Sequence, residues 1–323
     1  MKIIEITLLL LGSVIGAGFA TGAEIITFFG NLSLPVWCIS LIVGITMLGI
    51  IMLEILLYFP KDKQHQPIVL SNKKLWTNYI FEIITIVIYF VLFTAMTAGI
   101  TTITNIWVTI ISLACSIAIV LFGFNKLSQL NTYIVFVIIT LIITTALPHL
   151  TAQNTANFNL SEIPSGVLWG FLYAGLNCFM FPELIKAVSY RQKRSTLIYS
   201  SILTSVIIML LVGLILTTIQ NCQTTNTAIP LLAAAPNPIT ITIILLAILT
   251  SQYTALFAIQ QKCTKIFPTT KNRPFLTVVG ICFLAFLTSF LGFTHIINFA
   301  YPLIGIFTCV FLLISWLKSW QQA

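Results

Sequence analysis

The sequence predicts an all-α, polytopic membrane protein with ten transmembrane helices. Of the 323 residues, 59% are hydrophobic and only 7% are charged, and the mean hydropathy is +1.07. Soluble domains have about 25% charged residues, and no soluble core could bury this much apolar side chain. A helix needs about 20 apolar residues to cross the hydrocarbon core. Ten such runs follow one another along the chain: 4–29, 34–58, 76–101, 105–124, 128–150, 165–188, 196–220, 238–261, 274–293 and 296–317.

The distribution of basic residues agrees with ten helices. With this count, all 15 Lys and Arg residues fall on one side of the membrane, whereas connections on the other side, such as 151–164 and 221–237, contain none. Basic residues favour the cytoplasmic side. The sequence therefore predicts a multi-pass protein of the cell (inner or plasma) membrane with both termini in the cytoplasm. The net charge of +8 then follows from topology, and a nucleic acid partner is not needed.

The N-terminus has an alternative interpretation. Met1 and Lys2, followed by LLLLGSVIGA, resemble a cleavable signal peptide. However, the apolar run continues to Phe29, and Glu5 is out of place in a basic leader. Cleavage would also remove one helix and spread the basic residues over both sides. We therefore interpret 4–29 as the first transmembrane helix.

The first and sixth runs share unusual features. Residues 12–24 read GSVIGAGFATGAE and residues 166–183 read GVLWGFLYAGLNCFMFPE; each begins Gly-x-x-x-Gly and ends in a glutamate. Glycine weakens a helix by about 0.8–1 kcal/mol relative to alanine. Because each segment opens a block of five helices, the pattern indicates inverted repeats, 1–150 and 151–323, with discontinuous first and sixth helices. The alternative is that Gly-x-x-x-Gly serves helix packing alone.

Interrupted helices have chemical consequences. Backbone groups freed within a membrane are tolerated only in the protein interior or facing water. Freed amides at a helix N-terminus favour an anion such as a carboxylate, and freed carbonyls favour a cation. One location could therefore hold a zwitterion, or a substrate beside a sodium ion.

Three motifs resemble those of a known superfamily. IGAGFATGAEIITFF in the first run, LYAGLN in the sixth and AYPLIG at 300–305 resemble the amino acid–polyamine–organocation superfamily, which has the LeuT-type five-plus-five fold. Within it, the chain is most similar to the YkvI family of bacterial membrane proteins. The resemblance implies the fold more strongly than it implies a substrate.

The resemblance also implies a sodium site. Sodium-coupled members bind this ion between the break in helix 1 and an Ala-x-x-Thr-Ser pattern in helix 8. In this chain the pattern falls on Ala247, Thr250 and Ser251, and the carbonyl donors would be Gly12 and Ile15. The alternative is that the two hydroxyl groups only bond to carbonyls of their own helix.

A substrate pocket is expected at the two breaks. The amides of the first helix would hold a carboxylate, and the sixth helix would hold an amino group or a side chain. Phe181 could close the pocket together with Phe179, whereas Tyr253 is a possible wall for which ordinary packing is the preferred interpretation. The candidate substrate-binding residues are Gly16, Ala17, Gly18, Tyr89, Tyr173, Gly175, Asn177 and Phe179.

The carboxylates are interpreted separately. Glu24 follows the first break and is the candidate proton-coupling or gating group, because a buried carboxyl group holds its proton more readily. Glu183 is expected to pair with Lys186, one turn later. Glu54 and Glu82 lie near basic ends of their helices and are expected to be paired. Neither the three histidines nor the seven cysteines show metal-site spacing; the cysteines are interpreted as small buried apolar residues.

These observations favour a secondary active transporter of a small amino acid or related zwitterion or amine. It would work by alternating access, driven by Na⁺ or H⁺. The alternative is an amino-acid-sensing receptor without net transport, a role that germinant receptors show for this fold. An enzyme is not indicated, since HExxH, GxSxG and Walker motifs are missing. The expected partners are a small molecule and the bilayer, with no cofactor beyond Na⁺; the sequence leaves monomer and homodimer open.

Overall fold

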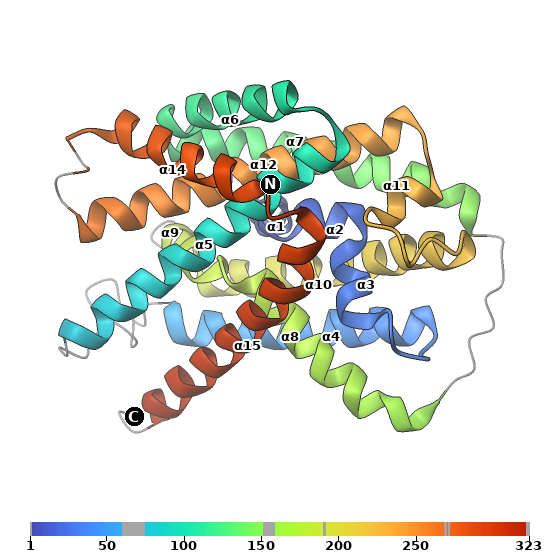
Figure 1. Cartoon of the computed structure of the whole chain (residues 1–323). Coiled ribbons are helices and arrows are strands. Elements are labelled where there is room, and N and C mark those ends of the chain that lie inside the picture. The colour runs from blue at the N-terminus through green and yellow to red at the C-terminus, as the bar shows by residue number, and fades with distance from the viewer. Residues whose placement is uncertain are drawn as a thin grey trace.

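The computed structural model describes residues 2–59, 75–150, 159–189, 192–267, 270 and 272–320, and every regular element in these ranges is helical (Figure 1). The first half contains α1 (Lys2–Val14), α2 (Ala17–Thr21), α3 (Ala23–Phe29), α4 (Val36–Tyr58), α5 (Leu75–Ile103), α6 (Ile106–Leu121), α7 (Phe124–Ala146) and the 3-10 helix η2 (Leu147–His149).

The second half begins with the 3-10 helix η3 (Leu160–Glu162) and continues with longer helices. These are α8 (Ile163–Cys178), α9 (Phe181–Ser189), α10 (Arg194–Asn221), α11 (Pro230–Ala234), α12 (Pro238–Ile266), α14 (Pro274–Ser289) and α15 (Phe293–Trp320).

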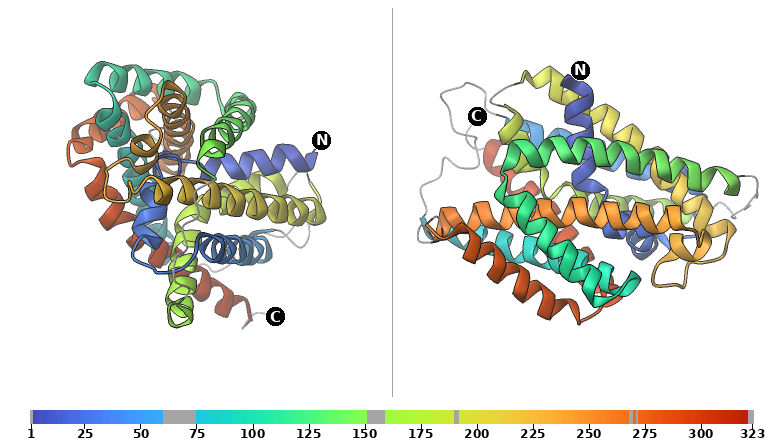
Figure 2. Two further views of the ribbon diagram at one scale, coloured as in Figure 1. Left: turned by 90° about the vertical axis from the view of Figure 1, so that its right-hand side faces the viewer. Right: turned by 90° about the horizontal axis from the view of Figure 1, so that it is seen from above.

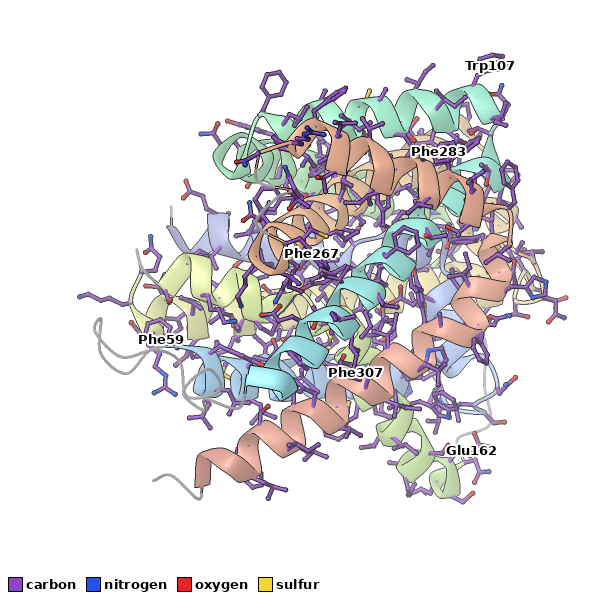
Figure 3. All side chains as sticks on the ribbon, turned by 60° about the vertical axis from the view of Figure 1, so that its left-hand side comes forward. Phe59, Trp107, Glu162, Phe267, Phe283 and Phe307 are labelled. Carbon is purple, nitrogen blue, oxygen red and sulfur yellow. The ribbon has the colours of Figure 1, made fainter. Side chains whose placement is uncertain are left out.

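Six helical segments in the described part of the chain are long and apolar enough to cross a membrane. They are Val36–Tyr58, Phe81–Ile103, Gln129–His149, Arg194–Asn221, Pro238–Ile266 and Phe293–Leu317. Three shorter apolar helices, Ile3–Val14, Ile106–Leu121 and Pro274–Ser289, accompany them. Large apolar side chains cover the outer surface, as Trp107 and Phe283 illustrate with exposed fractions of 70% and 60% (Figure 3). Such a surface suits lipid rather than water.

The helices enclose the interrupted segments. α12 packs on α5, α6 and α7, while α4 lies beside α10 (Figure 1). α8 packs against both α4 and α15. Figure 2 shows α1 lying between α7 and α10. This arrangement places the breaks in the middle of the molecule.

Local sequence explains several helix ends. Asn105 and Asn237 cap α6 and α12, because their side chains accept hydrogen bonds from the amides of Val108 and Thr240 at 3.1 and 2.8 Å. Gly22, with φ +76°, separates α2 from α3 in a left-handed conformation that other residues rarely adopt.

The first predicted interruption is present at Ile15 and Gly16, between α1 and α2. The amide of Gly16 donates to the carbonyl of Val14 at 2.8 Å, not to the carbonyl four residues earlier, as it would in an α-helix. The next amide, of Ala17, donates to Met96 Sδ at 3.3 Å. The carbonyls of Gly12 and Ser13 therefore lose their helical donors.

The second predicted interruption lies at Phe179 and Met180, between α8 and α9. The amide of Phe179 makes a long 3.4 Å bond to Leu176, so α8 ends in a tight turn. Pro182 has no amide hydrogen, and it is tolerated in the first turn of α9 because backbone amides there have no helical partner. The interrupted segments contact one another, since α3 packs on α8, and α1 packs on both α8 and α9.

Candidate functional site

A small cavity of about 40 Å³ lies between the two interruptions. A water molecule needs about 10–15 Å³ by this measure, so the cavity holds only a few water-sized groups. A larger groove of about 640 Å³ between α5, α14 and α15 lies on the apolar exterior and offers little polar chemistry. The cavity is lined by Ser13, Val14, Gly16, Glu24, Leu92, Met96, Leu176, Asn177, Met180, Ser251, Thr254, Ala255 and Tyr301.

Glu24 and Asn177 form the polar centre of this cavity. The two side chains are only 4% and 7% exposed. Asn177 Nδ2 donates to Glu24 Oε1 at 2.6 Å and to the carbonyl of Tyr173 at 3.0 Å. Gly18 lets the carboxylate approach, because a Cβ at this position would lie 2.6 Å from Glu24 Oε2. The site therefore has a buried acidic group supplied by α3 and an amide supplied by α8.

The backbone amides at the first break are not arranged as expected for a carboxylate. Gly16 uses its amide within the turn, and Ala17 donates to Met96. Gly18 faces the carboxylate of Glu24. A second anion beside Glu24 would be repelled, so this cavity is better suited to a positively charged group.

Four of the five predicted sodium-site residues come together at the first break. Ser251 Oγ donates to the carbonyls of Ile15, at 3.3 Å, and Ala247, at 3.0 Å. Thr250 Oγ1 donates to Ala247 at 2.8 Å. Four oxygen donors therefore gather where α12 meets the first break. The hydroxyl groups also bond within their own helix, as the alternative interpretation holds.

Gly12, the fifth predicted residue, has a carbonyl without a helical donor at the break, and the Cα side of this residue packs against Asn131 of α7. A Cβ at Gly12 would overlap the amide group of that side chain. Asn131 is 2% exposed and accepts a hydrogen bond from Tyr253 Oη at 3.3 Å. Gly12 thus allows close contact between α1 and α7, and Tyr253 is a packing residue with a polar contact.

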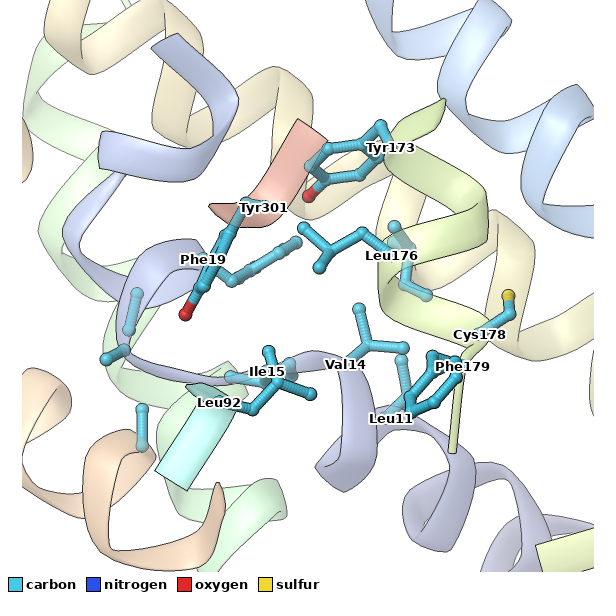
Figure 4. Packing of buried hydrophobic residues seen from close by; sticks show 14 of the residues in the cluster. Leu11, Val14, Ile15, Phe19, Leu92, Tyr173, Leu176, Cys178, Phe179 and Tyr301 are labelled. Carbon is cyan, nitrogen blue, oxygen red and sulfur yellow. The ribbon is translucent and has the colours of Figure 1, made fainter. Parts of the chain in front are cut away.

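Two buried tyrosines lie near the site: Tyr301 lines the cavity, and Tyr173 lies one turn before Asn177 on α8. Tyr173 packs edge-on against Phe28 and Phe29, with ring centroids 5.5 Å apart in both pairs. The hydroxyl groups of Tyr173 and Tyr301 are buried and have no hydrogen-bond partner within the described part of the protein. Figure 4 shows both tyrosines above the segment that contains Val14 and Ile15. Each hydroxyl could serve a bound ligand at little cost, since neither would give up a protein bond.

The other predicted pocket residues pack outside the cavity. Gly175 lies against Gly305 of α15, where a Cβ would be 2.8 Å from the Gly305 carbonyl oxygen. Phe179 packs edge-on against Tyr89 at 5.1 Å, on the opposite side of the break from Tyr173 (Figure 4). Phe181 is fully buried. These residues shape the surroundings of the site, and their role in binding stays a prediction.

The remaining carboxylates divide into three cases. Glu82 is paired as predicted, with Lys262 Nζ at 2.7 Å and with Lys265. The prediction for Glu54 is wrong, since neither oxygen has a hydrogen-bond partner among the described residues. It fails because the side chain turns into the helix interfaces and is 0% exposed. The side chain of Glu183, with its expected pairing, lies outside the described residues.

The prediction that the cysteines are buried is only partly correct. Cys38, Cys178 and Cys282 are buried, whereas Cys115 is exposed and Cys222, Cys263 and Cys309 are half-buried. Among the described residues, no group of three or more His, Cys, Asp or Glu side chains could hold a metal ion. Met96 and Met180, however, both line the cavity, and sequence reasoning missed them. Only the position of Met180 beside the second break could have indicated its role.

The comparisons with known proteins indicate the fold. No family model matches the sequence, and no curated protein matches it significantly. Among solved structures, the chain is similar to a manganese transporter from Eremococcus coleocola, crystallised in complex with an aromatic bis-isothiourea substituted compound. The TM-score is 0.59 and the identity 13%, over 97% of this chain and 78% of that chain. This protein is therefore a polytopic helical membrane protein that has the fold of a transporter.

Proposed function

We propose that this protein is a secondary active transporter that works by alternating access in the cell membrane. The observation that carries the proposal is the Glu24–Asn177 pair, which lines a small cavity where two interrupted helices meet. Intramembrane carboxylates are costly, and they mark substrate or ion pathways. The chain would form ten transmembrane helices of the LeuT type, with both termini in the cytoplasm.

The packing of the helices supports two inverted repeats, 1–150 and 151–323. Helices at equivalent positions in the two blocks pack together: α4 with α10, α5 with α12, and α6 with α14. Other contacts occur in matching pairs, since α4 packs on α8 as α10 packs on α1, and α15 packs on α8 as α7 packs on α1. A pseudo-two-fold axis would produce this pattern.

The proposed substrate is a small amine or an amino acid whose amino group binds Glu24 and Asn177. A buried carboxylate beside a carbonyl-rich break favours a cation. The small volume of the cavity suits the charged end of such a molecule, with further space created when the protein opens. In this orientation the amino group, not the carboxylate, faces the first interrupted helix.

A transition-metal cation is the second candidate substrate. Met96 and Met180 bring two thioether side chains to the cavity that contains Glu24 and Asn177. Thioethers favour soft metals and carboxylate oxygens accept harder ones. The solved structure with the same fold is that of a manganese transporter. We favour the amine. A metal ion would need the sulfur of Met96, which already accepts a hydrogen bond from the Ala17 amide, whereas an amine would not.

Two ions are proposed as the driving ion. Sodium would bind the carbonyls of Gly12, Ile15 and Ala247 with the hydroxyl groups of Thr250 and Ser251, after Ser251 releases the Ile15 carbonyl. A proton would instead be carried by Glu24.

A thermal-shift measurement distinguishes the two driving ions. Sodium-dependent stabilisation that is lost in the Thr250→Ala/Ser251→Ala double variant supports sodium. If sodium has no effect on the wild type, this sodium site is excluded.

Uptake into proteoliposomes tests the proposal. The probes are a panel of radiolabelled amino acids and small amines, and Mn²⁺ in a separate arm. We expect flux of one class, abolished by Glu24→Gln. Glu5→Gln is the matched control, because Glu5 is exposed on α1. Binding of a probe without flux would overturn the transporter proposal in favour of a receptor; neither binding nor flux in either arm would exclude both substrate classes.

A further inference from the structure

Glu54 is a second buried carboxyl group that the proposed site does not use. It lies near the end of α4, is 0% exposed, and both of its oxygens lack hydrogen-bond partners among the described residues. An ionised carboxylate without a partner is very unfavourable in a protein interior, and such groups bind a proton instead. We propose that Glu54 is a proton-binding site beside the interruption between α8 and α9.

Helical spacing places Glu54 opposite the second interruption. Met47 of α4 contacts Cys178 at the end of α8, with the two sulfur atoms 3.8 Å apart. Glu54 follows Met47 by seven residues, so it lies on the same face about two turns further along. Along this face, α4 packs against both α8 and α9. The Glu54 carboxyl group therefore faces the end of α8 and the start of α9.

A cation on α9 lies close to the same end of α4. Tyr58 follows Glu54 by one turn, and the ammonium group of Lys186 lies over the Tyr58 ring, 5.0 Å from its centroid. α10 and α15 also pack on α4, but neither oxygen of Glu54 has a hydrogen-bond partner among the side chains described there. The described titratable groups on this part of the packed helices are Cys178 of α8, Tyr58 of α4 and Lys186 of α9; the side chain of Glu183 on α9 lies outside the described residues.

This geometry links the proton to the position of α9. In the present arrangement no described side chain bonds to the Glu54 carboxyl group, so a negative charge there is uncompensated and the proton stays bound. A movement of α9 along α4 by about one turn, or about 5.4 Å, would bring Lys186 level with Glu54 and favour release of the proton. Only this movement rests on the proposed transport function; the proton site depends on the burial of Glu54 alone.

Infrared difference spectroscopy tests the proton site directly, with protons and D₂O as the only probes. Purified protein in lipid would be measured at neutral pH, where a protonated carboxyl group has a C=O stretching band distinct from that of a carboxylate. We expect the wild type to show this band and Glu54→Gln to lose the absorbance of a single carboxylic acid. Glu82→Gln is the control, because Glu82 is paired with Lys262 and should not contribute to the band.

The outcomes are distinct. Loss of the band in Glu54→Gln, with or without a further contribution removed by Glu24→Gln, supports the proposal. An unchanged band in Glu54→Gln, or a band that disappears only in Glu24→Gln, overturns it. If Glu54→Gln does not fold, Glu54→Asp keeps the acid and should shift the band without removing it; an unshifted band contradicts the proposal. Because no solute is used, failure of the transport assay leaves this result unaffected.

Discussion

At the scale of single residues, the site depends on glycines, which have no side chain, as much as on the polar residues around them. Gly18 leaves room for the Glu24 carboxylate, and Gly16 leaves room for Ser251, whose Oγ would be 3.0 Å from a Cβ there. The side chains of Glu24 and Asn177, which are 153 residues apart in the sequence, then come into contact. Each residue was identifiable as unusual within its own segment. Their direct bond was not predictable, since it depends on how α3 and α8 pack.

Substitution of Gly18 tests this view. In Gly18→Ala the new methyl group would lie 2.6 Å from Glu24 Oε2 and 3.1 Å from the Tyr301 ring, so the carboxylate must move away from Asn177. We expect a destabilisation of about 1–3 kcal/mol, measured by unfolding in mixed detergent. We also expect loss of probe binding, measured by thermal shift.

Gly49→Ala is the matched control for that variant. Gly49 also lies in a helix, but a Cβ there meets nothing within 4 Å. The control should be neutral or more stable by up to about 1 kcal/mol, because alanine favours the helix. Equal stability of the two variants would show that the close approach of Glu24 to Gly18 does not matter.

At the scale of helices, the elements were more predictable than the contacts between them. Apolar length and glycine clusters anticipated the helical runs and both interruptions, because these depend on local sequence. The Gly-x-x-x-Gly pattern was more ambiguous, and the structure shows that part of it serves packing: Gly166 and Gly170 both face α4, with Ile42 near each. The burial of Glu54 depends on which face of α4 meets α8 and α9, so charge and position in the sequence misled the prediction.

The contact between α8 and α15 gives a prediction at this scale. At Gly305 a Cβ would lie very close to the backbone carbonyl of Leu172, so Gly305→Ala must push the two helices apart. We expect a loss of about 1–3 kcal/mol in unfolding free energy. Gly280→Ala in α14, where a Cβ meets nothing within 4 Å, should not destabilise the protein; a similar loss in both variants would argue against close helix contact.

At the scale of the whole molecule, the two proposed repeats differ in one respect. The second part of the first interrupted helix packs extensively, α2 on α12 and α3 on α15. The equivalent contacts in the other repeat would join α9 to α5 and α7, and among the described residues no comparable packing exists there. The side of the molecule bounded by α2 and α3 is therefore closed more tightly than the side bounded by α9, which is the side of the basic residues.

Cysteine accessibility tests this asymmetry. Thr254 lines the cavity on α12, beyond Ser251 in the direction of the basic end. In a background without native cysteines, Thr254→Cys should react with a membrane-impermeant thiol reagent added on the basic side, at least tenfold faster than from the opposite side. Thr227→Cys, in the exposed connection between α10 and α11, should show the reverse preference. Faster reaction of Thr254→Cys from the opposite side would contradict the asymmetry.

The narrowness of the cavity has a consequence for selectivity. A space of about 40 Å³ cannot admit a cation with its full hydration shell, so the ligand must exchange water for the few oxygen and sulfur atoms of the wall. Mg²⁺ gives up its water reluctantly, whereas an alkylammonium group or a soft metal ion does so more readily. Dehydration free energy, rather than charge alone, would then decide which of the abundant cations of the cell is excluded.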